Sequence, residues 1–425
     1  MVNHESYNPS TLKITDLRTV IIASNFDYPI IRIDTNQGVY GLGEVRDAGN
    51  REYALQFKGM LLDQNPMNIE ALFREMKGRT GQRKNGFSGQ GGRESGGISA
   101  IEMALWDIIG KVYEVPVYQF LGGKYRDKIR IYADTPAPVD PTPQCFAERA
   151  LQRKRAGLTF IKFDMGIDVL QEARITDSLT DNRPTEKGIA YMASCVAAVR
   201  EAIGWEIPLA IDHLGPLSVK DCIRVGNTLE KFNLAWLEDM RPEYDVDGMI
   251  EITRAIRTPT LIGEGLFSLD GFREIIDKRA VDLIQPDLAT AGGIRETKKI
   301  ADYAEEKSSM STVQHFAGSP ISFMANIHVA AAIHNFVALE HHGLDIPWWK
   351  DLVTGLPDPL MVNGYVNVPE KPGLGVDLNE EVIVNHLKYP ELGYFKPTPE
   401  WNKTATNSAS GYKPLSWFVS DLPIK

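Results

Sequence analysis

Cysteine is scarce in this chain of 425 residues, which contains only Cys145, Cys195 and Cys222. The number is odd, and no two of these residues form a Cys-x-x-Cys pair. Disulfide-stabilised domains and cysteine zinc sites need paired cysteines, often at short spacings. The sequence therefore indicates neither a disulfide scaffold nor a cysteine zinc site.

Excess basic charge and long apolar runs are also lacking. Lys and Arg number 46 against 56 Asp and Glu, so the formal net charge is −10, which disfavours binding to a phosphate backbone. No apolar run approaches the ~18–20 residues that span a bilayer. The first residues show no basic segment followed by an apolar stretch, the pattern of a secretory signal. We therefore expect a cytoplasmic protein with no nucleic-acid or membrane partner.

What is present is the composition of a globular protein, with 43% hydrophobic and 24% charged residues. Apolar and polar residues alternate from Leu12 to about Glu44, which predicts paired strands. Helical periodicity follows in three places, near residues 51–62, 69–77 and 98–115. The Gly- and Arg-rich stretch 78–97 has no such period and is expected to be a mobile loop. Residues 1–127 are thus predicted to form an α+β domain.

Eight short apolar runs follow, each succeeded by an amphipathic helical pattern: IRIYAD, FIKFDM, PLAIDH, LAWLEDM, TLIGEG, DLIQPDL, STVQHF and FVALEHH. Strands that alternate with helices indicate a parallel sheet with helical crossovers. Eight such units in ~250 residues are typical of a (β/α)₈ barrel of the TIM type. We therefore predict this barrel over residues 128–355 and a C-terminal segment over 356–425 that ends in a polar tail.

Polar residues end most of these runs: Lys162, Asp164, Asp212, Glu238, Glu264, Asp287, His315 and Glu340. Side chains at the carboxyl ends of barrel strands converge on one mouth. A single carboxylate is most often a solvated surface charge. However, a charge that directly follows a run such as LAWL is costly to bury without a partner or a metal. Asp212, Glu238 and Glu264 would form an all-oxygen site, which suits Mg²⁺ better than Zn²⁺.

In these motifs the sequence resembles the enolase superfamily, and within it the mandelate racemase-like acid-sugar enzymes. The resemblance rests on the order and spacing of IKFD, AIDH, WLED, IGEG, IQPDLATAGGI, VQHFAGSP and LEHHG. It covers nearly the whole chain, from an N-terminal capping domain through the barrel to a C-terminal segment that completes the capping domain. It implies one divalent ion, usually Mg²⁺, which is held by Asp212, Glu238 and Glu264 and stabilises an enediolate. Because a proton α to a carboxylate is very weakly acidic, its removal requires such charge compensation.

The remaining strand ends supply candidate acid–base groups. Their spacing lets Asp287 orient His315 and raise its basicity, and the resemblance implies the same pair as a dyad on one face of the substrate. The resemblance also implies that Glu340 hydrogen-bonds the substrate carboxylate in a protonated form with a raised pKa. Lys162 is the candidate base for the opposite face, since a nearby divalent cation can lower the pKa of a lysine.

Two motifs depart from the family pattern. Lys-x-Lys is common in the family, whereas this chain has Lys162-x-Asp164. If Asp164 pairs with Lys162, the lysine stays charged and serves as an electrostatic or substrate-binding group, or the pair only shapes the mouth. Asp-x-Asn is replaced by Asp212-His213-Leu214, and His213 is either a substrate contact or a packed, hydrogen-bonded histidine. His342 shares the strand face of Glu340 and is expected to line the pocket.

Substrate choice is expected to depend on loops of the N-terminal domain, where Arg46 and Arg83 are candidates for contacting a polyhydroxy acid. We predict a Mg²⁺-dependent acid-sugar dehydratase, a hydro-lyase that eliminates β-hydroxide from an enediolate to give a 2-keto-3-deoxy acid. The alternatives are a cycloisomerase that expels a ring oxygen from a lactone or anhydro-sugar acid, an epimerase or racemase, and a non-catalytic sugar-acid-binding protein. The predicted partner is a small sugar acid, and the resemblance implies a homo-oligomer, either a dimer or an octamer.

Overall fold

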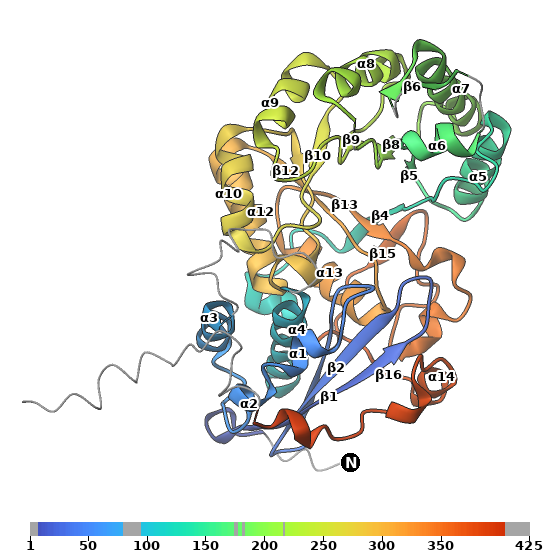
Figure 1. The fold of residues 1–425 in the computed structure, drawn as a ribbon. Helices are drawn as coiled ribbons and strands as arrows, with labels where there is room; N and C mark the ends of the chain where they lie inside the picture. The colour runs from blue at the N-terminus through green and yellow to red at the C-terminus, as the bar shows by residue number, and fades with distance from the viewer. Residues whose placement is uncertain (1–6, 80–94, 174–176, 181–182, 216, 404–425) are drawn as a thin grey trace, which may run out of the picture.

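The computed structural model describes residues 7–79, 95–173, 177–180, 183–215 and 217–403. Its lower part in Figure 1 contains an antiparallel sheet of three strands, β1 (Ile14–Ile22), β2 (Tyr28–Thr35) and β3 (Tyr40–Glu44). Four helices follow: α1 (Glu52–Leu55), α2 (Lys58–Leu61), α3 (Ile69–Arg79) and α4 (Gly96–Val112). The helical pattern expected near residues 51–62 appears as two short helices, because a turn at 56–57 separates α1 from α2. We call this part the capping domain.

The sheet and helix α4 of the capping domain approach each other to backbone contact. A Cβ atom at Gly41 would lie 1.9 Å from the carbonyl oxygen of Ala104, and one at Gly43 would lie 2.0 Å from that of Ala100. Only glycine allows this separation, so β3 and α4 pack together closely. Glu44 at the end of β3 and Glu102 in α4 are therefore carried by one packed unit.

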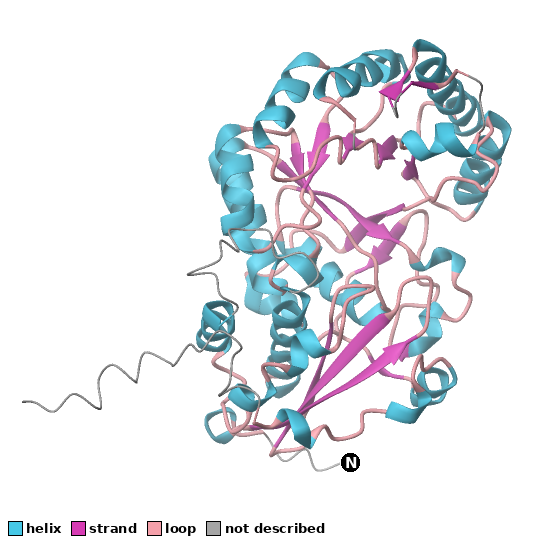
Figure 2. Ribbon diagram, viewed as in Figure 1, coloured by secondary structure: helices cyan, strands magenta, loops and turns pink. Residues whose placement is uncertain are grey.

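All eight apolar runs become strands of one closed parallel barrel, which confirms the predicted fold class (Figure 2). The strands are β4 (Lys128–Ala133), β5 (Ile161–Asp164), β8 (Leu209–Asp212), β9 (Leu237–Glu238), β10 (Thr260–Ile262), β11 (Leu283–Ile284), β12 (Ser311–Gln314) and β13 (Phe336–His341). They pair in this order, and β13 closes the barrel by pairing with β4, where Leu339 lies opposite Ile131. Closure brings the carboxyl ends of all eight strands to one mouth.

Side chains fill the interior of the barrel. The buried residues of this inner cluster come from or directly precede most of the strands: Tyr132, Phe160, Ala210, Trp236, Leu261, Val313 and Ala338. The rings of Phe160 and Trp236 are 4.8 Å apart, and Tyr132 meets Trp236 edge to face at 5.5 Å. The barrel is therefore a packed core that presents its polar strand ends at the mouth.

Helices cover the outside of the barrel: α5 (Pro143–Arg155), α6 (Ile167–Glu172), α7 (Glu186–Ile203), α8 (Val219–Leu229), α9 (Val246–Ala255), α10 (Ser268–Lys278), α11 (Leu288–Ala291), α12 (Ile294–Ser308) and α13 (Pro320–Ala332). A small hairpin of β6 (Leu179–Thr180) and β7 (Arg183–Pro184) follows α6. Several helices begin at a side-chain cap, for example Thr142, Thr185, Ser218, Asp245 and Ser319. Within the described ranges, no helix combines the length and the apolar character needed to cross a membrane.

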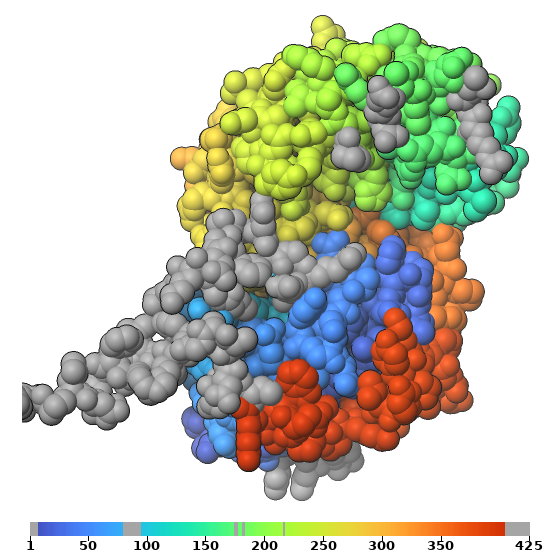
Figure 3. Space-filling view, in the orientation of Figure 1, coloured from blue at the N-terminus to red at the C-terminus, as the bar shows by residue number. Residues whose placement is uncertain are grey.

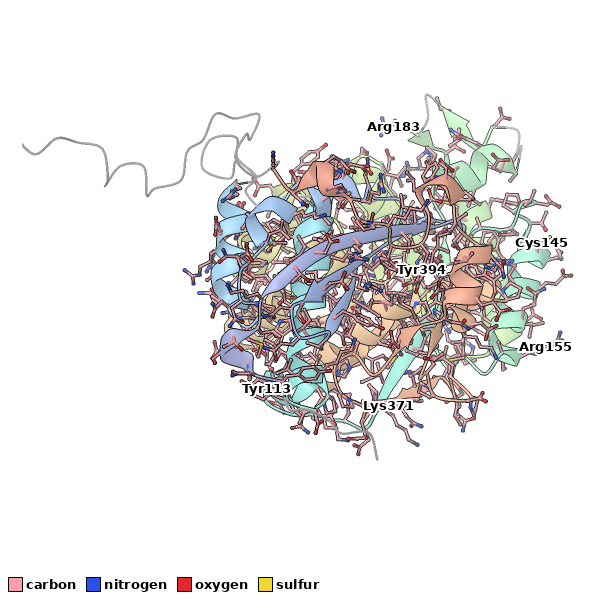
Figure 4. All side chains as sticks on the ribbon, turned by 90° about the horizontal axis from the view of Figure 1, so that it is seen from below. Tyr113, Cys145, Arg155, Arg183, Lys371 and Tyr394 are labelled. Atoms are coloured by element: carbon pink, nitrogen blue, oxygen red, sulfur yellow. The ribbon has the colours of Figure 1, made fainter. Side chains whose placement is uncertain are left out.

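The C-terminal segment contains β14 (Val353–Thr354), β15 (Tyr365–Asn367), β16 (Asp377–Leu378) and α14 (Glu380–Asn385). Strand β15 pairs antiparallel with β4 and so extends the barrel sheet. The chain then returns to the capping domain, where Tyr40 Oη donates to Asp377 Oδ1 at 2.6 Å and Lys58 Nζ donates to the carbonyl oxygen of Thr398 at 2.9 Å. Figure 3 shows this red segment against the blue N-terminal residues, and in Figure 4 Tyr394 lies beside the same sheet. Most of the predicted polar tail, residues 404–425, lies outside the described residues.

Candidate active site

Three carboxylates from the barrel mouth meet the ammonium group of Lys162, which projects from β5. Its Nζ lies 2.5 Å from Asp212 Oδ2, 2.9 Å from Glu238 Oε1 and 2.7 Å from Glu340 Oε1. Burial lowers the pKa of Lys162, but the charges of these carboxylates raise it well above its ordinary value. These contacts favour the charged ammonium form of Lys162. Of the roles considered from the sequence, they favour an electrostatic group over a base.

Asp164 is not an ion-pair partner of Lys162 within the described ranges, although the sequence left such a pair open. Among the described residues, the ion pairs of Lys162 are with Asp134, Asp212, Glu238 and Glu340. Oδ1 of Asp164 instead lies 3.9 Å from Nε2 of His213. Burial, followed by the charges of Asp134 and Asp212, raises the pKa of Asp164 to about 9. The ammonium group is directed to the more deeply buried carboxylates, and Asp164 is left beside other acids.

Asp287 and His315 lie in direct contact at the ends of β11 and β12. Nδ1 of His315 is 2.6 Å from Oδ2 of Asp287, and Nε2 is 3.0 Å from Oε2 of Glu264. The second oxygen of Asp287, Oδ1, accepts the backbone N–H of Thr290 at the start of α11, at 2.8 Å. Burial lowers the pKa of His315, but the charges of Glu264 and Glu340 raise it well above its ordinary value. The structure thus brings the two members of the expected dyad together in a geometry in which Asp287 orients the imidazole ring.

Arg46 reaches Glu264 from the capping domain. Its Nη2 lies 3.1 Å from Glu264 Oε1, and its Nη1 donates to the Glu264 carbonyl oxygen at 2.6 Å and to Thr290 Oγ1 at 3.0 Å. The residue is only 7% exposed, and Nε donates to Asp47 at 3.2 Å. Because these donors are engaged within the protein, the geometry favours a role in holding Glu264 over the predicted contact with substrate.

The contacts of Glu340 favour an ionised carboxylate, whereas the resemblance implies a protonated one. Its Oε2 accepts a hydrogen bond from Tyr132 Oη at 3.0 Å, and its Oε1 faces Lys162. Burial raises its pKa, but the positive charges of Lys162 and His315 lower it well below the ordinary value. The neighbouring Lys162 and His315 therefore favour the ionised form of Glu340.

The donor chemistry of the predicted metal ligands fits a hard divalent cation, since Asp212, Glu238 and Glu264 offer only carboxylate oxygens. Asp212 and Glu238 already share one cationic atom, Lys162 Nζ, and burial together with Asp212 raises the pKa of Glu238 well above its ordinary value. Glu264 instead contacts Arg46 and His315. In the part of the chain that the structure describes, two groups of three residues have donor atoms within 4.8 Å of one another: His315, Glu340 and His342, and Asp164, Asp212 and His213. The three-carboxylate site remains a prediction.

The two other candidate histidines lie at the mouth. His213 has a left-handed backbone (φ 58°) and a side chain that is 57% exposed. Nε2 of His342 lies 3.4 Å from Glu340 Oε1, and its ring is 5.8 Å from that of His315 and 5.9 Å from Phe26 of the capping domain. His342 is therefore placed to line a pocket next to the dyad. Arg83, the remaining candidate, lies outside the described residues.

Two acids near the mouth were not singled out from the sequence. Asp239 and Glu243 line a cavity of about 250 Å³ together with His213. Oδ1 of Asp239 is buried without a hydrogen-bond partner among the described residues, and burial followed by Glu264 and Asp212 raises its pKa well above the ordinary value. Glu243 Oε1 accepts the Gly265 N–H at 2.8 Å, and burial raises its pKa to about 7. The signal for Asp239 was its position directly after Glu238 in WLED.

The chain is similar in sequence to several sugar-acid dehydratases over most of its length. It is 35% identical over 377 residues to a D-xylonate dehydratase of Haloferax volcanii, which covers 88% of this chain and 89% of that protein. It is 29% identical to a D-gluconate/D-galactonate dehydratase of Picrophilus torridus, with coverage of 89% and 93%.

Solved structures share the fold. A mandelate racemase/muconate lactonizing enzyme-like protein from Rubrobacter xylanophilus superposes with a TM-score of 0.81 at 32% identity, covering 91% of this chain and all of that one. A member of the enolase superfamily from Salmonella Typhimurium gives a TM-score of 0.78 at 28% identity, with coverage of 88% and 97%.

Family models match both parts of the molecule. Residues 15–122 match the mandelate racemase / muconate lactonizing enzyme N-terminal domain, and residues 146–382 match the enolase C-terminal domain-like family. With the closed barrel and the capping domain described above, these matches identify the chain as a member of the mandelate racemase/muconate lactonizing enzyme group of the enolase superfamily.

Proposed function

We propose that this protein is an acid-sugar dehydratase that removes water from an aldonic acid to give a 2-keto-3-deoxy acid. The observation that carries the proposal is the contact between Asp287 and His315 beside Glu264 and Glu340 at the mouth of the barrel. Relatives named as dehydratases of D-xylonate, D-gluconate and D-galactonate support this choice of reaction and of substrate class.

The side chains of this chain supply the acid–base chemistry. Asp287 accepts the Nδ1–H of His315 and so orients Nε2 for proton transfer. The charged ring can donate the Nε2 proton to the leaving hydroxyl, and once it has lost that proton Nε2 can accept the α-proton. Lys162 places a positive charge beside Asp212 and Glu238. This charge would stabilise the negative charge that develops on the substrate carboxylate when the α-proton leaves. A Mg²⁺ ion held by Asp212, Glu238 and Glu264 would add to this charge compensation.

The elimination balances without an oxidant or reductant. The α C–H bond breaks and its proton passes to the base, the electron pair forms the enediolate, and the β C–O bond then breaks. The leaving hydroxide takes up a proton and departs as water, and the resulting enol tautomerises to the 2-keto acid. We infer that His315 acts either as the base or as the acid that assists the leaving hydroxyl.

A screen of aldonic, aldaric and anhydro-sugar acids with Mg²⁺ tests the proposal. We expect turnover of a five- or six-carbon aldonate, with a product lighter by one water that reacts as a 2-keto acid. His315→Asn should reduce kcat by about 10²–10⁴-fold, which separates true turnover from a contaminating activity. Recovery of a product of unchanged mass would contradict the dehydratase proposal and indicate cycloisomerisation or epimerisation. Binding without any turnover would point to a sugar-acid-binding protein.

A further inference from the structure

Glu44 of the capping domain is inserted into the loop that carries His315. Its Oε1 accepts the backbone N–H of Ser319 at 2.8 Å, and its Oε2 accepts the hydroxyl of Ser319 at 2.6 Å and the N–H of Ser322 at 3.3 Å. Ser319 is the N-cap of α13 and lies four residues after His315. One buried carboxylate from β3 therefore binds the first turn of the helix that follows the histidine.

Glu102 makes the equivalent contact with the neighbouring loop. Its Oε2 accepts the N–H of Ile294 at 2.7 Å and its Oε1 accepts the N–H of Arg295 at 3.0 Å, at the start of α12. The segment between Asp287 and Ile294 contains only the short helix α11 and two glycines. A second buried carboxylate, from α4, thus binds the helix that follows the aspartate of the dyad.

Each loop contains a glycine where the carboxylate enters. A Cβ atom at Gly293 would lie 2.0 Å from Oε2 of Glu102, and one at Gly318 would lie 2.9 Å from Oε1 of Glu44. A larger residue at either position would displace the carboxylate. Two unrelated loops therefore share the same arrangement of a glycine, a helix start and a carboxylate from the capping domain.

From this arrangement we propose that Glu44 and Glu102 are positioning residues. From the capping domain, they hold the loops that carry His315 and Asp287 in the positions at which the two side chains meet. The inference rests on the proposed function of the dyad. Because β3 and α4 are in backbone contact at Gly41 and Gly43, the two glutamates move as one unit. A shift of the capping domain would therefore displace both loops together.

The burial of Glu44 and Glu102 is energetically costly, which favours a specific structural role for these side chains. Glu44 and Glu102 are 1% exposed, and burial raises the pKa of each to about 8. A buried carboxyl group, protonated or charged, is costly unless hydrogen-bond partners compensate its burial. The helix N-terminus offers free N–H groups and a favourable dipole, and both glutamates use it. The hydrogen bonds fix the loop backbone at the position where each helix begins.

Asp107 provides a matched control in the same domain. It is also a fully buried carboxylate of α4, but it accepts the N–H groups of Leu42 and Leu374 and so joins the capping sheet to the C-terminal segment. It also accepts from Lys111 Nζ at 2.6 Å. Asp107→Asn replaces one acceptor oxygen by an NH₂ group and so weakens these contacts without touching either dyad loop.

The test compares Glu44→Gln, Glu102→Gln and Asp107→Asn in the full-length protein. We expect both glutamine variants to lower kcat about tenfold with KM changed less than about twofold, since small misplacements of catalytic groups reduce the rate strongly. Amide hydrogen exchange should become about tenfold faster in residues 316–323 for Glu44→Gln and in residues 288–297 for Glu102→Gln. Asp107→Asn should lower the melting temperature but leave kcat and both exchange rates as in the wild type.

The inference fails if the glutamine variants change only the melting temperature, or if Asp107→Asn reduces kcat to the same extent. Ser319→Ala, which removes one donor to Glu44, provides a milder second variant should Glu44→Gln not fold; unchanged exchange in residues 316–323 of this variant would also overturn the inference. Hydrogen exchange needs no substrate. Absence of turnover by the wild type would therefore refute the proposed function, while the exchange rates still decide whether the glutamates hold the loops.

Discussion

At the scale of single residues, the geometry of the site depends on which atoms each oxygen of a carboxylate contacts. One oxygen of Asp287 caps helix α11 by accepting the N–H of Thr290, and the other binds Nδ1 of His315. Its position is therefore set by the backbone of its own loop before it meets the histidine. The carboxylate can in this way fix both the orientation of the ring and the nitrogen that carries the proton.

Asp287→Asn tests this division. An asparagine can still accept the Thr290 N–H through its oxygen, but its NH₂ group would face Nδ1 of His315. Nδ1 would then have to accept, the proton would move to Nε2, and Nε2 could no longer act as a base in the neutral ring. We expect kcat to fall by about 10²–10⁴-fold with a small change in KM, measured by steady-state kinetics on the substrate found in the screen.

Asp302→Asn is the matched control for this variant. Asp302 is an aspartate on the outer helix α12 that pairs with Lys298 in an exposed contact. Its loss should leave kcat within about twofold, because an exposed ion pair contributes little. Activity of Asp287→Asn within tenfold of the wild type would contradict the proposed role of Asp287.

At the scale of secondary-structure elements, two barrel helices begin on carboxylates that belong to another domain. Glu44 binds the start of α13 and Glu102 the start of α12, and burial raises the pKa of each to about 8. Between the ordinary glutamate pKa and this value, the folded protein retains protons that the unfolded chain has lost. Their contribution to stability is complete below about pH 4.5 and is lost as the pH rises towards 8.

The double variant Glu44→Gln, Glu102→Gln should remove this pH dependence. We expect the wild-type free energy of unfolding to decrease more steeply between pH 5 and 8 than that of the variant, with a difference in slope of up to about 1.4 kcal/mol per pH unit for each carboxyl group. Chemical denaturation followed by fluorescence at several pH values measures both slopes. Parallel slopes would show that the two carboxyl groups keep an ordinary pKa in the folded protein.

At the scale of the whole molecule, the capping domain and the described part of the C-terminal segment lie together on one side of the barrel. The capping sheet, helix α4 and the C-terminal segment pack together, and Arg46, Glu44 and Glu102 project from this layer into the loops of the mouth. The carboxylates of the mouth are balanced by Lys162 and Arg46, one from the barrel and one from the cap. The site therefore belongs to both domains.

Addition of Mg²⁺ should stabilise the folded protein as a whole, since an ion that binds only the folded state raises its stability, by about 2.7 kcal/mol at a hundredfold excess over the Kd. We expect a rise of a few degrees in the melting temperature, measured by differential scanning calorimetry without substrate. Glu238→Gln should abolish the rise. Glu251→Gln, at an exposed partner of Lys220, should retain it. An equal rise in both variants would place the ion elsewhere.

The eight barrel strands and the chemistry-bearing residues at their ends could be predicted from sequence, because the period of the pattern and the position after each apolar run are local properties. The pairing of Asp287 with His315 could also be expected, since closure of a parallel barrel brings such positions to one mouth. The partners of Lys162 could not be predicted, and a pairing with Asp164 was one of the alternatives left open. Spacing places Asp164 on the same strand face, but only the tertiary structure shows which buried carboxylates lie nearest its ammonium group.

The sequence by itself determined which polar side chains end the barrel strands and in what order, because each follows its own strand. Only the tertiary structure decided which of these charged side chains pair with one another and with residues of the capping domain. Arg46, Glu44 and Glu102 are far in sequence from Glu264, His315 and Asp287, and no local pattern relates them. Hydrogen bonds and pKa shifts depend on distances and burial, which arise only when the cap and the barrel pack together.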